Sequence, residues 1–207
     1  MRIVLLSWEF PPRVVGQLGE YVRELAVRLV KENMEAHVVT YHDYWTGTLQ
    51  ETDGSFTTRV TNPVRTHIGV LTWVLTLNQE VERVTANIYY DARRHVDLID
   101  AHDWHFLPAA VTLKKAFDLP FVYSVDSLEE HRSHGANSPF NMAIKSIEWL
   151  GMFEAAKLVV KSDWMCDEVN RIYRVPIEKI EVISPKTSEW IKSTIQIYKI
   201  VAEGAHA

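Results

Sequence analysis

The sequence predicts an α/β protein with a single doubly wound, mostly parallel sheet and helices on both of its faces. Along the 207 residues, short apolar runs rich in β-branched side chains alternate with longer segments of helical periodicity. The run Arg2–Ser7 is almost continuously apolar, which is typical of a strand buried on both faces of a parallel sheet. Strands separated by helices of this length indicate right-handed crossovers, which place helices over the sheet.

The first third of the chain begins with this strand and continues through a turn-rich loop, residues 8–17. A helix is expected at 18–33, because its apolar residues recur at helical spacing. Residues 36–41 form the second expected strand. The stretch that follows, 42–69, is polar and rich in turn residues, and we expect only a weak edge strand in it, at 57–61.

The alternation resumes beyond residue 70. Further helices are expected at 71–92, 106–117, 139–156 and 163–173, and further strands at 96–101, 120–125, 158–161 and 180–184. Within the third of these helices, Trp149, Met152 and Phe153 follow helical spacing, so we expect all three to pack in the core.

Composition excludes several classes of protein. A formal net charge of −5 argues against binding to nucleic acid driven by electrostatics. The single cysteine, Cys166, excludes an intramolecular disulfide framework and a cysteine-based zinc cluster, and we expect it to pack inside a helix. No run approaches the roughly 20 apolar residues of a membrane helix. Because Met1 is followed directly by the first strand, no signal peptide is expected, and the expected location is the cytoplasm.

In a doubly wound sheet, ligands bind outside the carboxyl ends of the strands. Four loops are therefore candidates: residues 8–18, the loop after Tyr41, residues 102–105 and residues 126–138. Tyr41 itself, at the end of a strand, could line a carbohydrate groove or merely anchor its loop.

The first loop carries Gly16 just before a helix and Gly19 within its start. Glycines at this place let backbone N–H groups and the helix dipole approach an anion such as a phosphate. The spacing matches neither the dinucleotide fingerprint nor the P-loop, so a plain turn is the alternative.

The third loop, His102-Asp103-Trp104-His105, gathers two imidazoles, a carboxylate and an indole at a strand end. Histidine can donate a hydrogen bond to a substrate, and tryptophan packs well on the apolar face of a sugar. The alternative for Asp103 is a structural cap on the next helix.

The fourth loop is long and rich in acidic residues and histidines, but it lacks any recognised metal-ligand spacing, so a solvated surface loop is favoured over a metal site. A catalytic triad could be drawn from Ser124 or Ser127 with His102, although no nucleophile elbow is present. We expect neither a metal nor a cofactor.

Combined motifs reveal a resemblance over residues 1–185. The segments Ser7–Gly16 and Leu18–Val22, the later Ala101–His105, the strand Tyr123–Ser127 and the strand Ala155–Ser162 resemble landmarks of glycogen and starch synthases and related retaining glycosyltransferases, especially archaeal ones. The resemblance implies a Rossmann-like domain that is one half of a GT-B fold, the amino-terminal half that mainly binds the acceptor glucan.

The resemblance also implies site residues. Gly16 and position 17 would approach the donor, ADP-glucose or UDP-glucose, while His102 would lie near the transferred sugar with position 126 beside it. This chain departs from the pattern twice: Gln17 replaces the second glycine of a pair, and Asp126 replaces a histidine. A side chain at a close-approach position forces the loop elsewhere, and an ionised carboxylate cannot donate a hydrogen bond as imidazole does.

The third departure concerns the carboxy-terminal donor domain of the resembled synthases. Here Pro185 is followed almost at once by a segment that resembles their final helix, so Lys186 and Thr187 would mark a splice across a deleted domain. Residues 186–207 would then return to pack on the same domain. Their apolar residues would cover core otherwise open to water: Trp190, Ile191, Ile195 and Tyr198.

The resulting hypothesis is an edited acceptor-side domain without transfer activity of its own, with Asp126 and His102 as catalytic-site residues. The residues that would bind donor or acceptor are Gly16, Gln17, Asp103, Trp104 and Tyr41. An engineered or repurposed module that holds a glucan or another small ligand is the alternative. A hydrolase or metal site built from Asp126, His102, His131 and His134 ranks last. The exposed former interdomain face suggests a homodimer.

Overall fold

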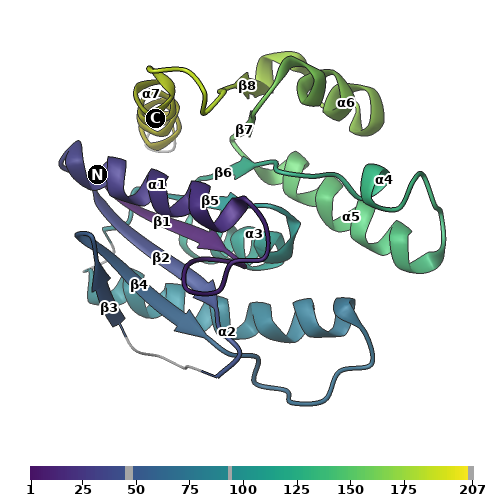
Figure 1. Cartoon of the computed structure of the whole chain (residues 1–207), viewed down its shortest axis with the longest axis horizontal. Coiled ribbons are helices and arrows are strands. Elements are labelled where there is room, and N and C mark those ends of the chain that lie inside the picture. The colour runs from purple at the N-terminus through teal and green to yellow at the C-terminus, as the bar shows by residue number, and fades with distance from the viewer. Residues whose placement is uncertain (45–48, 93–94, 205–207) are drawn as a thin grey trace.

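The computed structural model describes residues 1–44, 49–92 and 95–204. Within these ranges one sheet of eight strands runs in the order β3-β4-β2-β1-β5-β6-β7-β8 (Figure 1). The strands are β1 (Arg2–Ser7), β2 (Glu35–Tyr41), β3 (Leu49–Thr52), β4 (Ser55–Val60), β5 (Leu98–His102), β6 (Phe121–Ser124), β7 (Lys157–Val160) and β8 (Ile180–Val182). Neighbouring strands pair in parallel except β3, which is antiparallel to β4.

Helices cover both faces of this sheet. They are α1 (Leu18–Lys31), α2 (Val70–Asp91), α3 (Leu107–Phe117), α4 (Glu129–Arg132), α5 (Pro139–Glu154), α6 (Asp163–Tyr173) and α7 (Trp190–Gly204), with one-turn 3-10 helices at Trp104–Phe106 and Ile177–Lys179. Among the described helices, none combines the length and the apolar composition that crossing a membrane requires.

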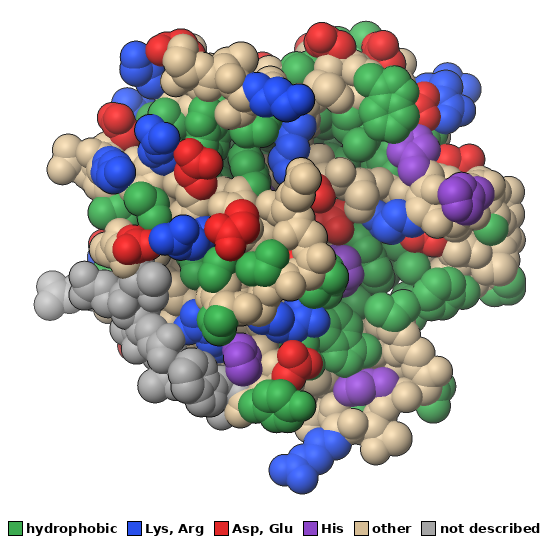
Figure 2. All heavy atoms as spheres, viewed as in Figure 1, with side chains coloured by type: hydrophobic (Ala, Val, Ile, Leu, Met, Phe, Trp, Pro, Cys, Tyr) green, Lys and Arg blue, Asp and Glu red, His purple; other side chains and the backbone are tan. Residues whose placement is uncertain are grey.

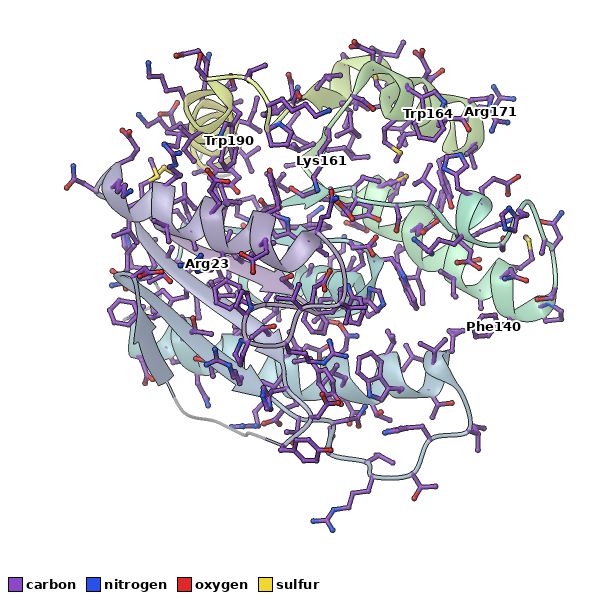
Figure 3. All side chains as sticks on the ribbon, in the orientation of Figure 1. Arg23, Phe140, Lys161, Trp164, Arg171 and Trp190 are labelled. Atoms are coloured by element: carbon purple, nitrogen blue, oxygen red, sulfur yellow. The ribbon has the colours of Figure 1, made fainter. Side chains whose placement is uncertain are left out.

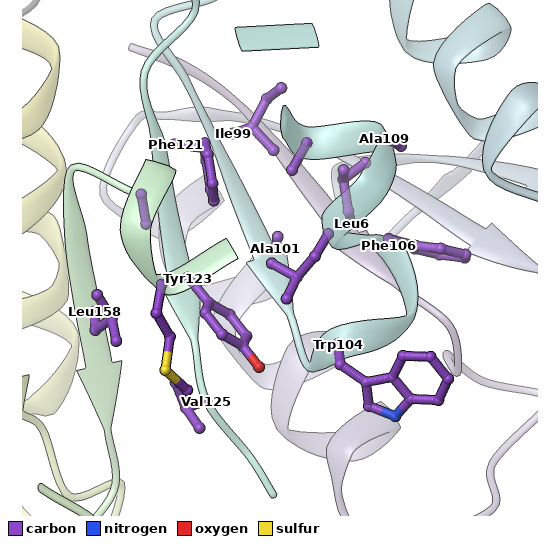
Figure 4. Packing of buried hydrophobic residues seen from close by; sticks show 14 of the residues in the cluster. Leu6, Ile99, Ala101, Trp104, Phe106, Ala109, Phe121, Tyr123, Val125 and Leu158 are labelled. Carbon is purple, nitrogen blue, oxygen red and sulfur yellow. The ribbon is translucent and has the colours of Figure 1, made fainter. Parts of the chain in front are cut away.

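Two hydrophobic cores confirm the doubly wound arrangement. Val4 and Leu6 of β1 lie in the core under α2, α3 and α5, part of which Figure 4 shows. Ile3 and Leu5 of the same strand lie in the second core, under α1 and α7. Because successive side chains of a strand point to opposite faces, a continuously apolar strand is what two covered faces require. The predicted fold class is therefore confirmed.

The edge of the sheet differs from the prediction. The expected edge strand is β4, which lies inside the sheet between β2 and β3. The true edge, β3, was not predicted. It is joined to β4 by the two-residue turn Asp53–Gly54, in which both residues have positive φ, 51° and 81°. An Asp-Gly pair with this backbone is a strong hairpin signal, and it outweighs the polar composition of the flanking residues.

The expectation for the aromatic residues of α5 was wrong in part. Met152 is buried, but Trp149 and Phe153 are 48% and 64% exposed and stack on each other with ring centroids 5.4 Å apart. The reason is Gly151, which faces α3 so closely that an added Cβ would lie 2.5 Å from Leu107. Residues two positions before and after an inward-facing helical residue point away from the core. Cys166 is buried, as expected.

Helix α7 packs on the sheet face that also carries α1. Its buried residues Trp190, Ile191, Ile195 and Tyr198 belong to the second core together with residues of β1 and α1. The chain passes from β8 to α7 through residues 183–189 alone. The division of the chain at residue 186 into a domain and a returning helix stays a prediction.

Candidate functional site

The carboxyl ends of β1, β5 and β6 open into a cleft of about 500 Å³ between α2 and α5. In Figure 2 the surface is hollowed right of centre at this place, between apolar side chains. The residues of the cleft wall that bear on its chemistry are Trp8, Glu9, Gly16, Asp103, Trp104, His105, Asp126, Ser127, Glu129, Arg132 and Phe140. Of the predicted site residues, the structure thus brings Gly16, Asp103, Trp104 and Asp126 together.

Glu9, which the sequence analysis missed, organises the loop after β1. Its buried carboxylate accepts hydrogen bonds from the backbone N–H of Val15, at 2.5 Å, and of Gly16, at 2.8 Å. The N–H of Gly16 is one of the groups that the sequence analysis offered to a phosphate, whereas Gly19 lies farther along, in the first turn of α1. The protein's own carboxylate occupies the N–H groups of Val15 and Gly16, so an anion would have to displace it to bind them in the observed conformation.

Gly16 and Gln17 face different hollows. Gly16 lines the cleft, and an added Cβ would make only an ordinary contact, 3.5 Å from Glu9 Oε1. Gln17 precedes the first turn of α1, is exposed, and lines a separate groove of about 850 Å³ along that helix, with Tyr21 and Lys161. The side chain at position 17 therefore does not obstruct the cleft.

Asp103 enters the cleft from the end of β5 with a strained backbone. Its φ of 63° lies in the left-handed region that glycine favours, although the residue is buried. Burial opposes ionisation of the carboxyl, but the His105 imidazole 3.6 Å away and the charge of Arg132 outweigh it, so the pKa of Asp103 is lowered. The residue stands at the N-cap position of the turn Trp104–Phe106, as the structural alternative expects, although its side chain makes no capping hydrogen bond. Strain and burial beside a cleft are nevertheless typical of functional residues.

His105 is the histidine that lines the cleft. Its ring stacks on Trp8 with centroids 4.4 Å apart, and it lies equally close to Trp104. Its Nδ1 is 3.6 Å from Asp103 Oδ2. The sequence analysis noted His105 only as a member of the loop and favoured its neighbour His102.

His102 is completely buried on the opposite side of β5, among the residues under α1 and α7. Its Nε2 lies 3.2 Å from Asp100 Oδ2, and the ring of Tyr21 meets it edge-on at 6.0 Å. Alternation along β5 explains this placement, since residues 100 and 102 share one face of the sheet. Direct catalysis by His102 stays a prediction, without support from its position.

Asp126 is held by a neighbouring strand. Lys161, directly after β7, donates a hydrogen bond to its carboxylate and lies 4.3 Å over the ring of Tyr21. Figure 3 shows Lys161 between the end of β7 and α1. The carboxylate that replaces the expected histidine is therefore paired, although about a third of its surface is exposed.

Tyr41 does not line the cleft, and it is connected to the wall residue Trp8 through Arg13. Its hydroxyl donates to Asp43 at 2.9 Å, and the guanidinium of Arg13 lies 4.8 Å from its ring centroid. Burial, followed by the bond to Asp43, raises the pKa of the Tyr41 hydroxyl. Arg13 also covers the ring of Trp8, at 5.1 Å. These contacts favour the loop-anchor alternative for Tyr41.

Arg132 of α4 connects the fourth loop to the cleft. Its guanidinium donates to Glu129, to Ser127 and, at 2.6 Å, to the fully buried Glu148, and it lies 5.7 Å from the ring of Trp104. A buried carboxylate needs such a partner. The first part of the loop thus forms a wall of the cleft, whereas His134 and residues 136–138 are exposed, as expected of a surface loop. Helix α4 was not predicted. The described residues contain no group of three His, Cys, Asp or Glu side chains placed to hold a metal ion.

Comparison with known proteins gives this geometry a context. Residues 18–185 match the model of Glycosyltransferase Family 4. An uncharacterized glycosyltransferase of Methanocaldococcus jannaschii is 32% identical over 192 residues, which are 92% of this chain and 47% of that protein. A glycogen synthase of Mycobacterium tuberculosis is 27% identical over 200 residues, 88% of this chain and 47% of that one. The chain therefore spans about half the length of these relatives.

Solved structures show the same fold. A sucrose-phosphate synthase from Thermosynechococcus elongatus matches 90% of this chain and 48% of its own, with a TM-score of 0.74 and 19% identity. A second structure, named sucrose-phosphate synthase 27_220_406_426 from the same organism, matches 98% of both chains, with a TM-score of 0.68 and 18% identity.

Proposed function

Since the chain belongs to Glycosyltransferase Family 4, we propose that it is the acceptor-side half of a glycogen-synthase-like glucosyltransferase. It binds an α-glucan or an oligosaccharide in the cleft between α2 and α5, and it transfers no glucose by itself. In the enzyme that it resembles, ADP-glucose or UDP-glucose would be the donor.

The observation that carries this proposal is the composition of the cleft wall. The stacked rings of Trp8 and His105, with Trp104 beneath them, offer an aromatic surface to the apolar face of a sugar. Around them, Asp103 and Asp126 offer carboxylate oxygens that accept hydrogen bonds from hydroxyl groups, and Arg132 offers donors. An aromatic floor with both kinds of polar group suits a neutral polyhydroxylated ligand.

The proposed lack of transfer activity rests on the groups that a nucleotide sugar needs. Glu9 places a carboxylate on the N–H groups of the glycine loop, where the donor phosphates would lie. The buried His102 does not reach the cleft, and Asp126 is already paired with Lys161. At the N–H groups of Val15 and Gly16, transition-state charge on a leaving diphosphate would therefore meet the Glu9 carboxylate instead of a free donor.

The proposed splice rests on the connection between β8 and α7. In the resembled synthases the donor domain stands between these two elements, whereas here residues 183–189 join them. The structure named 27_220_406_426 supports the proposal, because its name carries two separate ranges and its chain matches nearly all of this one.

Calorimetric titration with maltoheptaose tests binding. We expect measurable affinity for the native chain and a loss of about tenfold in Trp8→Ala, because the aromatic surface is removed. Trp149→Ala is the matched control, since Trp149 is an exposed tryptophan on the outer side of α5, away from the cleft. Equal affinity of the native chain and both variants would contradict the cleft as the binding site.

Nucleotide release from ADP-glucose and UDP-glucose, with maltoheptaose as acceptor, tests the proposed inactivity. No steady release is expected at any protein concentration. Steady turnover would contradict it and would mean that a second copy completes the donor site.

A binding module for a different small ligand is the second candidate. The ion pair between Asp126 and Lys161 favours it, because it stabilises the chain at a place where a transferase needs a free group. A folded chain that ignores maltoheptaose, yet binds another polyol in the same cleft, would decide for this candidate.

We also propose that the rim of the cleft is covered by a second copy. Exposed apolar side chains stand on this rim: Val15 at 65% exposure, Phe140 at 44% and Val70 at 40%. Exposed apolar groups that gather at one edge favour association. Light scattering that shows a monomer at high concentration would exclude the dimer.

A further inference from the structure

A small polar cluster is buried in the second core, where α7 meets the sheet. The hydroxyl of Tyr198 donates a hydrogen bond to Asp100 Oδ2, and Ser124 Oγ donates to Asp100 Oδ1 at 2.8 Å. Asp100 and Tyr198 are almost completely buried, and Ser124 is buried as well. Apolar residues of α7 already seal this face of the sheet, so covering the core does not require a carboxyl group, whose burial is costly unless it is paired.

The cluster extends to the end of β5. His102 Nε2 lies 3.2 Å from the same Asp100 oxygen that accepts from Tyr198. The next residue, Asp103, donates its backbone N–H to the carbonyl of Ser124 at 3.0 Å. His102, which precedes Asp103 in the chain, and Ser124, whose carbonyl accepts the Asp103 N–H across the sheet, thus both belong to the cluster.

The strain at Asp103 needs such support. A non-glycine residue with φ of 63° keeps this backbone only where its surroundings fix it. On the cleft side, the contacts of Asp103 are longer: Ser127 at 3.3 and 3.4 Å, His105 Nδ1 at 3.6 Å and Arg132 at 3.9 Å. The shorter contacts that hold the strand end come from beneath.

We propose that Tyr198 is a positioning residue for the cleft: through Asp100 it holds the end of β5 and so keeps Asp103 in its strained conformation. Helix α7 is then part of the site as well as a cover for the core. The inference rests on the proposed function only for its binding readout, because its structural readout needs no ligand.

The test is Tyr198→Phe, which keeps the ring and its packing and removes only the hydroxyl. In ¹H–¹⁵N spectra of the free chain, the amide signals of Asp103 and Trp104 should shift and broaden. The amides of Val15 and Gly16, which Glu9 holds, should stay in place. Affinity for maltoheptaose should fall about fivefold, because Asp103 is then less firmly preorganised for the ligand.

Thr194→Val is the matched control. Thr194 is also buried on α7, but its hydroxyl donates to Trp190 O within the same helix and does not touch the cluster. We expect unchanged Asp103 and Trp104 signals and unchanged affinity. Should Tyr198→Phe fail to fold, Ser124→Ala removes the other hydroxyl donor of Asp100 and should shift the same two amides.

The outcomes separate this inference from the proposed function. Unchanged Asp103 and Trp104 signals in a folded Tyr198→Phe chain would overturn the inference and leave glucan binding untouched. Shifted signals in a chain whose native form ignores maltoheptaose would uphold the positioning role and overturn the proposed function.

Discussion

The loops after β1 and β5 leave the same edge of the sheet from paired strands, with Ser7 opposite His102. They differ in whether their polar groups are paired within the loop or available to a ligand. In the first loop the Glu9 carboxylate accepts hydrogen bonds from the N–H groups of Val15 and Gly16, so both groups are already paired within the loop. In the second, Asp103 is strained and ionised beside two aromatic rings. Glycine content made the first loop one candidate for binding, whereas its available polar groups favour the second loop as the candidate site.

The largest effect is expected from Glu9→Ala, which would remove the acceptor of two backbone N–H groups in the first loop. Two N–H groups would lose a charge-assisted acceptor, so the free energy of unfolding should fall by about 2 kcal/mol. Urea denaturation measures this. Glu24→Ala is the control, because Glu24 forms only an exposed pair with Arg28, and its loss should cost less than about 0.5 kcal/mol. Equal small effects in both variants would show that Glu9 does not hold the loop.

Asp103→Asn tests whether the charge of the Asp103 carboxylate, in the loop after β5, stabilises the fold. The pKa of Asp103 is lowered in the folded chain, so its carboxylate stabilises the fold above the unfolded pKa of about 3.9. That contribution is lost as the pH falls from about 3.9 through the folded pKa. Asparagine tolerates positive φ, so the native chain should exceed the variant by about 1 kcal/mol from pH 5 to pH 7.

Denaturation at a series of pH values checks this expectation. The advantage of the native chain should shrink as the pH is lowered below about 4. An advantage that stays constant down to pH 3 would show that the charge of Asp103 does not stabilise the fold.

The smallest effect is expected from Gln17→Gly, which restores the glycine of the resembled synthases. Because Gln17 faces the α1 groove and Glu9 keeps the loop closed, the variant should gain no affinity for UDP-glucose. The added backbone freedom should lower stability by well under 1 kcal/mol. Saturation-transfer NMR with UDP-glucose is the measurement, and clear binding by the variant would refute the idea that Glu9 closes the loop.

Much of the fold could be predicted because periodicity reports burial directly. The strands of the doubly wound sheet and its long helices follow from runs such as Arg2–Ser7. The hairpin at Asp53–Gly54 was within reach, since its turn residues are in the sequence. The outward direction of Trp149 was not, because it depends on how closely Gly151 approaches Leu107.

The candidate site was predictable in its location and less so in its residues. The strand-end rule placed Asp103 and Trp104 correctly at the cleft. The choice between His102 and His105 depended on where β5 ends, because one residue of register reverses the face. The bonds of Glu9 to residues six and seven positions later depend on a loop conformation that no periodicity encodes.

The position of α7 has a consequence for how the chain acquires its structure. The second core combines β1 and α1, from the beginning of the chain, with Trp190 and the residues after it. During synthesis the face under α2, α3 and α5 can therefore form first, while the α1 face stays open until α7 has left the ribosome. Contacts that far apart in sequence close slowly. A nascent chain held short of residue 190 should bind chaperones that recognise apolar surface, and release from them should coincide with the arrival of Tyr198 at Asp100.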